Sequence, residues 1–130
     1  MSSDSVQLCL SRKTGEMLHR LRANRPLVHC ITNEVVQEFT ANVLLAAGAS
    51  PAMVVGEGEA EYFAGIASAL SVNVGTPYEA RIETMKKAIR GAAAAGKPWV
   101  LDPVAAGGIP WRDKIIFELL EMHPTAVRGN

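Results

Sequence analysis

The stretch that decides the fold reads PLVHCITNEVVQEFTANVLLAAGASPAM and covers residues 26–53. Its first part, Leu27–Ile31, is apolar and partly β-branched without polar alternation, a pattern typical of a central strand covered on both faces. Thr32 and Asn33 interrupt this run, and Asn33 is a favourable N-cap for the helical pattern that follows, which Gly48 ends. The stretch therefore predicts a strand, a polar elbow and a helix, an arrangement that places elbows at the ligand-binding edge of open α/β sheets.

Four further apolar runs alternate with helical patterns along the chain. We expect strands at residues 52–55, 71–74, 99–101 and 126–127. We expect helices over residues 4–22, broken or bent near Gly15, over a light segment with Phe63, Ile66 and Leu70 on its apolar face, and over residues 78–95 and 111–122. This alternation predicts an α/β fold with a mostly parallel sheet and helices on both faces. Because no helix follows the last strand, the sequence looks cut within a single domain over residues 1–130.

The composition favours one compact domain that binds a small ligand. The chain has 130 residues, and its apolar content of 48% is enough for a hydrophobic core. Its 13 basic and 13 acidic residues give a formal net charge of +0, so no bulk field favours nucleic acid or an anionic membrane as a partner. Cys9 and Cys30 form no Cys-x-x-Cys motif, and we find neither a secretory leader nor a membrane-spanning run, which predicts a cytoplasmic protein.

Three polar side chains stand at the ends of expected strands. Asp102 follows residues 99–101 and is fixed by Pro103, so it could hold Mg²⁺ or simply cap a turn. Arg128 follows the last strand, where its fork of donors could bind phosphate oxygens or remain a surface charge without a role. Asn33 is divided in the same way between capping and ligand contact. The sequence alone leaves these alternatives open.

His29 and Cys30 lie within the first apolar strand and have plain structural interpretations. A histidine in such a strand is more often a hydrogen-bonded core residue than a catalytic base. Cys30 has no activating partner beside it in the sequence, so a small buried hydrophobe is favoured over a nucleophile. We therefore expect both residues in the core.

Six blocks of sequence carry a family resemblance. They read PLVHCITN at residues 26–33, FTAN at 39–42, LLAAGASPAM at 44–53, NVGT at 73–76, LDPV at 101–104 and VRGN at 127–130. Together, and in this order, they resemble hydroxyethylthiazole kinases, the thiazole-salvage enzymes of thiamine biosynthesis. The resemblance implies a ribokinase-like α/β fold, a homotrimer with active sites between subunits, and transfer of the ATP γ-phosphoryl group to the alcohol of 4-methyl-5-(2-hydroxyethyl)thiazole with Mg²⁺.

The resemblance also implies roles for individual residues. Met53 matches the family's thiazole-contacting methionine, whose polarizable thioether suits a sulfur heterocycle. Arg128 matches the family's ATP-binding arginine, which would spread positive charge along phosphate oxygens. Asn33 matches a polar residue at the substrate crevice, and Asp102 matches a strand-end acid near the metal and phosphates. No catalytic residue is carried over, because the family's catalytic cysteine lies in a glycine-rich segment that Cys30 does not match.

The chain departs from the family pattern in two ways. Where the family usually reads Asp-Pro-Val-Gly-Ala-Gly, residues 102–107 read DPVAAG, so alanine replaces glycine at Ala105 and removes backbone freedom there. The chain also stops before the family's second half, so we expect the N-terminal portion of a single kinase domain. The alternative is a catalytically dead remnant that acts at most as a small-molecule binding or oligomerisation module.

Overall fold

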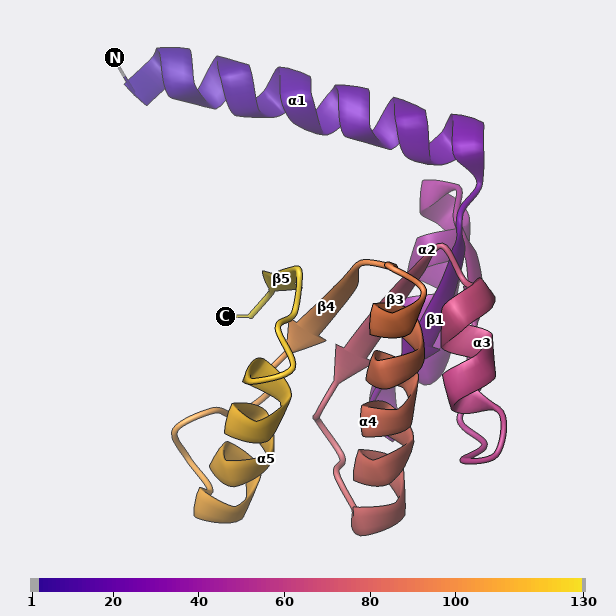
Figure 1. The fold of residues 1–130 in the computed structure, drawn as a ribbon. Helices are drawn as coiled ribbons and strands as arrows, with labels where there is room; N and C mark the ends of the chain where they lie inside the picture. The colour runs from indigo at the N-terminus through magenta and orange to yellow at the C-terminus, as the bar shows by residue number, and fades with distance from the viewer. Residues whose placement is uncertain (1–2, 130) are drawn as a thin grey trace.

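The computed structural model describes residues 3–129 and shows strands alternating with helices (Figure 1). The strands are β1 (Leu27–Ile31), β2 (Ser50–Ala52), β3 (Ala69–Asn73), β4 (Trp99–Asp102) and β5 (Ala126–Val127). The helices are α1 (Ser3–Asn24), the 3-10 turn η1 (Glu34–Val36), α2 (Gln37–Ala47), α3 (Ala60–Ile66), α4 (Glu79–Ala94) and α5 (Pro110–Leu120). Asn130, the last residue of the VRGN block, lies outside the described residues. The predicted alternation of strands and helices is confirmed.

The five strands form one sheet in the order β2-β1-β3-β4-β5, and every neighbouring pair is parallel. The predicted parallel α/β fold is therefore confirmed. Leu27–Ile31 is an interior strand, as predicted, because β1 pairs with β2 on one side and β3 on the other, although β3 lies in the middle of the sheet. The chain moves outward from β1 to β2 and then returns past β1 to β3. The carboxyl ends of β1 and β3 are thus the topological switch point, where open α/β sheets bind ligands.

Helices cover both faces of the sheet. Figure 1 shows α3, α4 and α5 side by side on one face and α2 on the other. Met85 and Ile89 of α4 and Leu119 of α5 pack in one buried cluster with Leu70 of β3 and Leu101 of β4. This cluster is the core, and it lies between the sheet and the three-helix layer. Right-handed crossovers explain why α2 lies on the opposite face from the other three helices. The β1 to β2 connection, which contains α2, runs along the sheet in the opposite direction from the later connections.

Two predicted segments have different bounds in the structure. Leu70 was expected on a helical face, but α3 ends at Ile66 and Leu70 is a buried residue of β3. The expected strand at residues 52–55 is instead Ser50–Ala52. Gly48 ends α2 in the left-handed region with φ +108. Only two residues later, the backbone N–H of Ser50 donates a hydrogen bond to the carbonyl oxygen of Pro26 at 2.9 Å. The strand therefore begins earlier than its apolar residues indicate.

The helix α1 is continuous through Gly15, so the predicted break or bend was wrong. An added Cβ at Gly15 would meet nothing within 4 Å, which places this glycine on open helix surface where no packing forces a kink. Figure 1 shows α1 extending past the sheet with its N-terminal end far from β1. The exposed apolar side chains of α1 include Leu8 and Met17. Among the described residues, no helix combines the length and apolar character that a membrane crossing requires.

Candidate functional site

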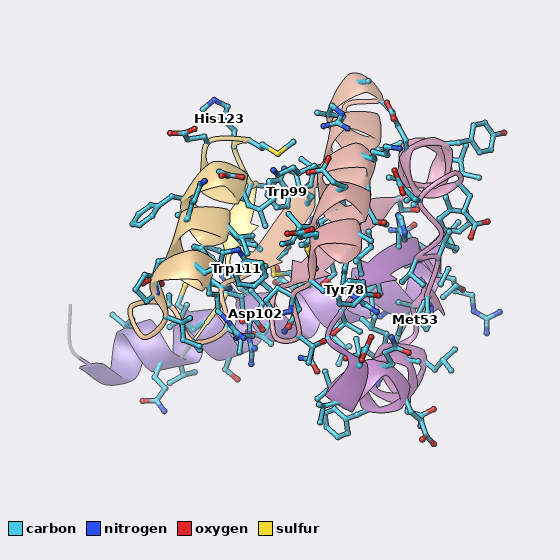
Figure 2. All side chains as sticks on the ribbon, turned by 90° about the horizontal axis from the view of Figure 1, so that it is seen from below. Met53, Tyr78, Trp99, Asp102, Trp111 and His123 are labelled. Carbon is cyan, nitrogen blue, oxygen red and sulfur yellow. The ribbon has the colours of Figure 1, made fainter. Side chains whose placement is uncertain are left out.

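All the predicted site residues lie at the carboxyl ends of the strands, the side of the sheet that we call the strand edge. Because the strands are parallel, their carboxyl ends share an edge, and a polar or soft side chain stands at each end. These residues are, in sheet order, Met53 after β2, Asn33 after β1, Asn73 ending β3, Asp102 ending β4 and Arg128 after β5. Figure 2 labels Met53 and Asp102 along this side of the ribbon, with Trp99 and His123 away from it. The predicted crevice residues therefore share one edge.

Four of these side chains form a continuous hydrogen-bonded line across four strands. Asn33 Nδ2 donates to Asn73 Oδ1 at 3.0 Å, and Asn73 Nδ2 donates to Asp102 Oδ2 at 3.0 Å. Arg128 Nη1 donates to the same Asp102 oxygen at 2.8 Å. The sequence analysis missed Asn73 as a site residue, although it ends an apolar run just as Asn33 and Asp102 do. That shared position was the signal that could have found it.

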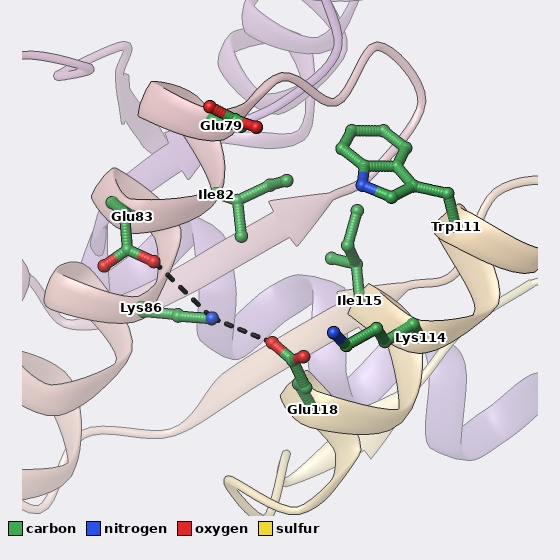
Figure 3. Close-up of a pocket in the computed structure, with 8 residues that line it drawn as sticks. All are labelled: Glu79, Ile82, Glu83, Lys86, Trp111, Lys114, Ile115 and Glu118. Carbon is green, nitrogen blue, oxygen red and sulfur yellow. Dashed lines mark hydrogen bonds and ion pairs between the residues drawn. The ribbon is translucent and has the colours of Figure 1, made fainter.

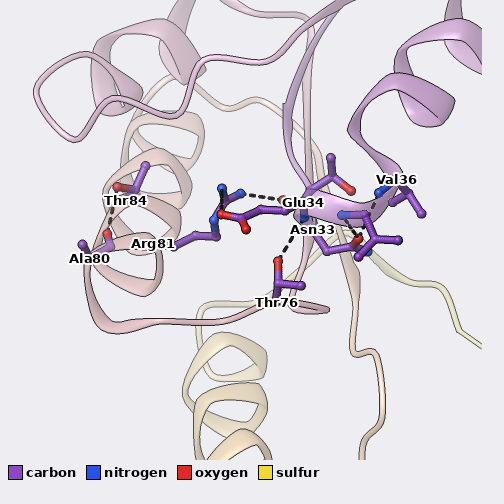
Figure 4. A network of polar contacts seen from close by, with 9 residues as sticks. Asn33, Glu34, Val36, Thr76, Ala80, Arg81 and Thr84 are labelled. Carbon is purple, nitrogen blue, oxygen red and sulfur yellow. Dashed lines mark hydrogen bonds and ion pairs between the residues drawn. The ribbon is translucent and has the colours of Figure 1, made fainter.

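The elbow after β1 is fixed by polar contacts on both sides (Figure 4). Asn33 Oδ1 accepts from the backbone N–H groups of Val35 and Val36 at 3.0 and 3.2 Å, so the predicted N-cap is confirmed. The helix opens with a 3-10 turn before α2 begins. The backbone N–H of Glu34 donates to Thr76 Oγ1 at 3.0 Å. The elbow is therefore tied to the loop that follows β3 as well as to its own helix.

Arg81 of α4 holds the same elbow from the helical layer. Its side chain is 5% exposed, and its Nη1 donates to the carbonyl oxygen of Thr32 at 2.6 Å. Its Nη2 forms an ion pair with Glu34 Oε1 at 3.3 Å, and its guanidinium lies 5.3 Å from the centre of the Tyr78 ring. Nothing in the helical pattern of α4 distinguishes this arginine from a surface charge, which is why the sequence analysis did not find it.

His29 and Cys30 are buried core residues, as predicted. His29 Nε2 donates to the carbonyl of Val54 at 2.7 Å, and its ring meets Phe63 edge-on at 5.1 Å. Nδ1 of the ring is buried without a hydrogen-bond partner among the described residues. Burial lowers the pKa of His29 and raises the pKa of the Cys30 thiol to about 11. His29 presents no ring nitrogen to a ligand, because the side chain is fully buried and its Nε2 is bonded to Val54, and a thiol with a raised pKa is a poor nucleophile.

A separate pocket lies between α4 and α5 (Figure 3). Ile82 and Ile115 form its floor, and Trp111 stands at one end. Lys86 Nζ reaches Glu118 at 2.8 Å and Glu83 at 3.5 Å, so this lysine is already paired with two carboxylates. None of the predicted site residues lines this pocket, and the strand edge is the better candidate site.

The part of the chain that carries the strand edge matches a known protein family. A sequence model of the hydroxyethylthiazole kinase family matches residues 18–130. The chain belongs to the hydroxyethylthiazole kinase family. The match includes all five strands and every side chain of the line from Asn33 to Arg128. The family resemblance seen in the sequence is thereby confirmed.

Curated and solved hydroxyethylthiazole kinases resemble this chain closely. The protein from Klebsiella pneumoniae subsp. pneumoniae is 59% identical over 116 residues, which are 89% of this chain and 45% of that protein. The protein from Shigella boydii serotype 18 is 51% identical over 125 residues, or 96% and 48% of the two chains. The solved kinase from Pyrococcus horikoshii superposes with a TM-score of 0.85 at 45% identity, covering 88% of this chain and 45% of that one. The chain spans less than half the length of these hydroxyethylthiazole kinases.

The loop after β4 carries backbone strain where this family member has alanine. Ala105 has φ +60, in the left-handed region that favours glycine. Ala105→Gly should therefore raise the free energy of unfolding by roughly 0.5–1 kcal/mol, net of the greater flexibility of glycine in the unfolded chain. Ala106 is equally exposed and has no positive φ, so Ala106→Gly should lower it by a similar amount. Urea denaturation of both variants checks this, and equal losses would contradict it.

The strand edge offers limited support for a magnesium ion, the metal that the family resemblance implies. Within residues 3–129, no group of three or more His, Cys, Asp and Glu side chains could hold a metal. Asp102 is the acid at the edge, and its Oδ2 already accepts from Asn73 and Arg128. Mg²⁺ in nucleotide sites commonly takes one or two carboxylates and completes its shell with phosphates and water. Asp102 fits that role only together with a nucleotide.

Proposed function

We propose that this chain is part of an ATP-dependent kinase that phosphorylates the hydroxyl group of 4-methyl-5-(2-hydroxyethyl)thiazole in thiamine salvage. The observation that carries the proposal is the hydrogen-bonded line from Asn33 to Arg128 at one strand edge, in a chain 59% identical to a hydroxyethylthiazole kinase. Phosphoryl transfer depends chiefly on positioning and on charge stabilisation. A row of amide, carboxylate and guanidinium groups at a topological switch point suits that task.

The two ends of the edge have different proposed roles. Met53 is partly buried after β2, and with Asn33 it would contact the thiazole. Arg128 lies at the other end of the sheet, and its side chain is 74% exposed, so it can leave Asp102 for the phosphates of ATP. Asp102 would then be free to face Mg²⁺, which neutralises phosphate charge when bound. A pocket of about 390 Å³ lined by Asp102, Pro103, Ala106 and neighbouring loop residues leaves room for the phosphates.

We further propose a cytoplasmic homotrimer. The apolar side chains that α1 and α2 leave exposed support an interface with other copies, and they include Leu8, Met17, Phe39 and Val43. Cys9 and Cys30 are free thiols, as expected in a reducing compartment. Light scattering after gel filtration measures the assembly directly, and a monomer at micromolar concentration would contradict the trimer.

Nucleotide binding tests the proposal most directly. We expect the chain to bind ATP with Mg²⁺ in calorimetry, and Arg128→Ala to weaken that binding by about 10- to 100-fold, because it removes a charged donor to phosphate. Arg90→Ala is the matched control, since Arg90 is an exposed arginine near the C-terminal end of α4, the end that leads into the start of β4. Equal affinities for Arg128→Ala and the unaltered chain would contradict the role of Arg128. Thiazole binding without phosphoryl transfer by the 130-residue chain would favour the alternative of a binding module.

A further inference from the structure

We propose that Asn73 and Gly75 are positioning residues that hold the thiazole side and the phosphate side of the strand edge in register, an inference that rests on the proposed function. Asn73 ends β3, the strand between β1 and β4. Its neighbours in the line are Asn33, which we place at the substrate, and Asp102, which we place beside the phosphates. Asn73 therefore stands where the two halves of the site meet.

The hydrogen bonds determine which way the Asn73 amide faces. Asn33 Oδ1 is occupied by the backbone N–H groups of η1, so Asn33 presents its NH₂ group to Asn73. Asn73 Oδ1 accepts this bond at 3.0 Å and also accepts the backbone N–H of Gly75 at 2.9 Å. Its NH₂ group must then face the carboxylate of Asp102. The N-cap of η1 thus sets the orientation of side chains as far as β4, and no flipped amide satisfies the same partners.

Gly75 makes the close approach between β3 and the elbow possible. A Cβ added at Gly75 would lie 2.7 Å from both Cβ and Nδ2 of Asn33. Real Cβ atoms do not approach other atoms so closely, so any larger residue at position 75 would push the Asn33 side chain away from Asn73. Gly75 is therefore needed for space rather than for a special backbone conformation, because its φ is not positive. Asn33 itself is only 9% exposed and has little room to move.

Two substitutions test the thiazole side and the phosphate side of the strand edge separately. Asn73→Asp keeps the acceptor for Asn33 and Gly75 but replaces the donor to Asp102 with a second carboxylate. We expect it to weaken Mg-ATP binding about tenfold while hydroxyethylthiazole binding changes less. Gly75→Ala displaces Asn33, but the backbone N–H of residue 75 can still hold Asn73 Oδ1 and so keep the Asn73 amide facing Asp102. We therefore expect it to weaken hydroxyethylthiazole binding about tenfold while Mg-ATP binding changes less. A merely structural role would weaken both ligands together, and equal losses in either variant would overturn the proposal.

Matched controls exclude nonspecific effects of charge and volume. Asn24→Asp adds the same charge at an exposed position that precedes the start of β1, and Gly58→Ala adds a methyl group where nothing lies within 4 Å. Both controls should leave both affinities within about twofold of the unaltered chain. A control that reproduces the selective loss seen for its partner would also overturn the proposal.

A measurement without ligand keeps this inference separate from the proposed function. In the unaltered chain, the side-chain amide protons of Asn33 should exchange slowly with solvent because Nδ2 donates to Asn73. Gly75→Ala should speed that exchange at least about tenfold, whereas Asn73→Asp should not, since its carboxylate still accepts the bond. NMR with ¹⁵N labelling measures both. Failure of the unaltered chain to bind either ligand would contradict the proposed function alone, while slow exchange in Gly75→Ala would contradict the positioning role.

Discussion

Replacing Gly91 with alanine should lower the free energy of unfolding by roughly 2–4 kcal/mol, although alanine is the better helix former. Gly91 lies within α4 where α3 crosses it, and an added Cβ would overlap the backbone carbonyl oxygen of Glu61. A backbone atom cannot move aside as a flexible side chain can, so the two helices would have to separate. The core residues Met85 and Ile89 of α4 would then lose contacts. Urea denaturation followed by circular dichroism measures the change.

Gly65 provides the control at the same helix contact. A Cβ at Gly65 would lie 3.6 Å from the carbonyl oxygen of Gly91 and 3.8 Å from Cβ of Ala95, which are ordinary van der Waals distances. Gly65→Ala should therefore raise the free energy of unfolding by roughly 0.5–1 kcal/mol through helix propensity alone. Opposite signs at the two glycines are the expected result. A neutral Gly91→Ala variant would show that α3 and α4 do not pack as closely as the structure indicates.

Removing the Arg81 side chain should cost roughly 2–4 kcal/mol of folding free energy and, on the proposed function, weaken hydroxyethylthiazole binding about tenfold. Thr32 is 5% exposed, and its carbonyl oxygen would lose the guanidinium donor that lies 2.6 Å away. Glu34 would lose its ion-pair partner, but its side chain is 58% exposed and water can replace the arginine there. Most of the loss should therefore come from the unpaired Thr32 carbonyl and the emptied space, and it should reach Asn33 through the elbow.

The comparison with Arg90 isolates this effect from the loss of a positive charge on α4. Arg90 is exposed on the same helix, so Arg90→Ala should change the free energy of unfolding by less than about 0.5 kcal/mol. Thermal and urea denaturation compare the two variants, and calorimetry with hydroxyethylthiazole compares their affinities. If Arg81→Ala loses stability but keeps its thiazole affinity, Arg81 supports the fold without ordering the substrate side of the edge.

Two predictions held because they depend only on neighbours in the sequence. The N-cap at Asn33 and the left-handed Gly48 need only the local backbone, and both are present in the structure. Leu70 was misplaced because three residues at helical spacing cannot show that the helix ends at Ile66. The bend at Gly15 failed because a glycine only permits a kink, and the exposed α1 has no packing that would demand one.

The sequence by itself determined that the chain alternates strands with helices, that the sheet is parallel, and that Asn33, Asp102 and Arg128 each stand at a strand end. Hydrophobic spacing and capping carry that information because they act over a few residues. Only the tertiary structure decided that β3 lies between β1 and β4, and so that Asn73 joins Asn33, 40 positions earlier, to Asp102, 29 positions later. It likewise brought the buried Arg81 to the elbow. Strand order follows from the direction in which each crossover packs on the sheet, and no local pattern records that direction.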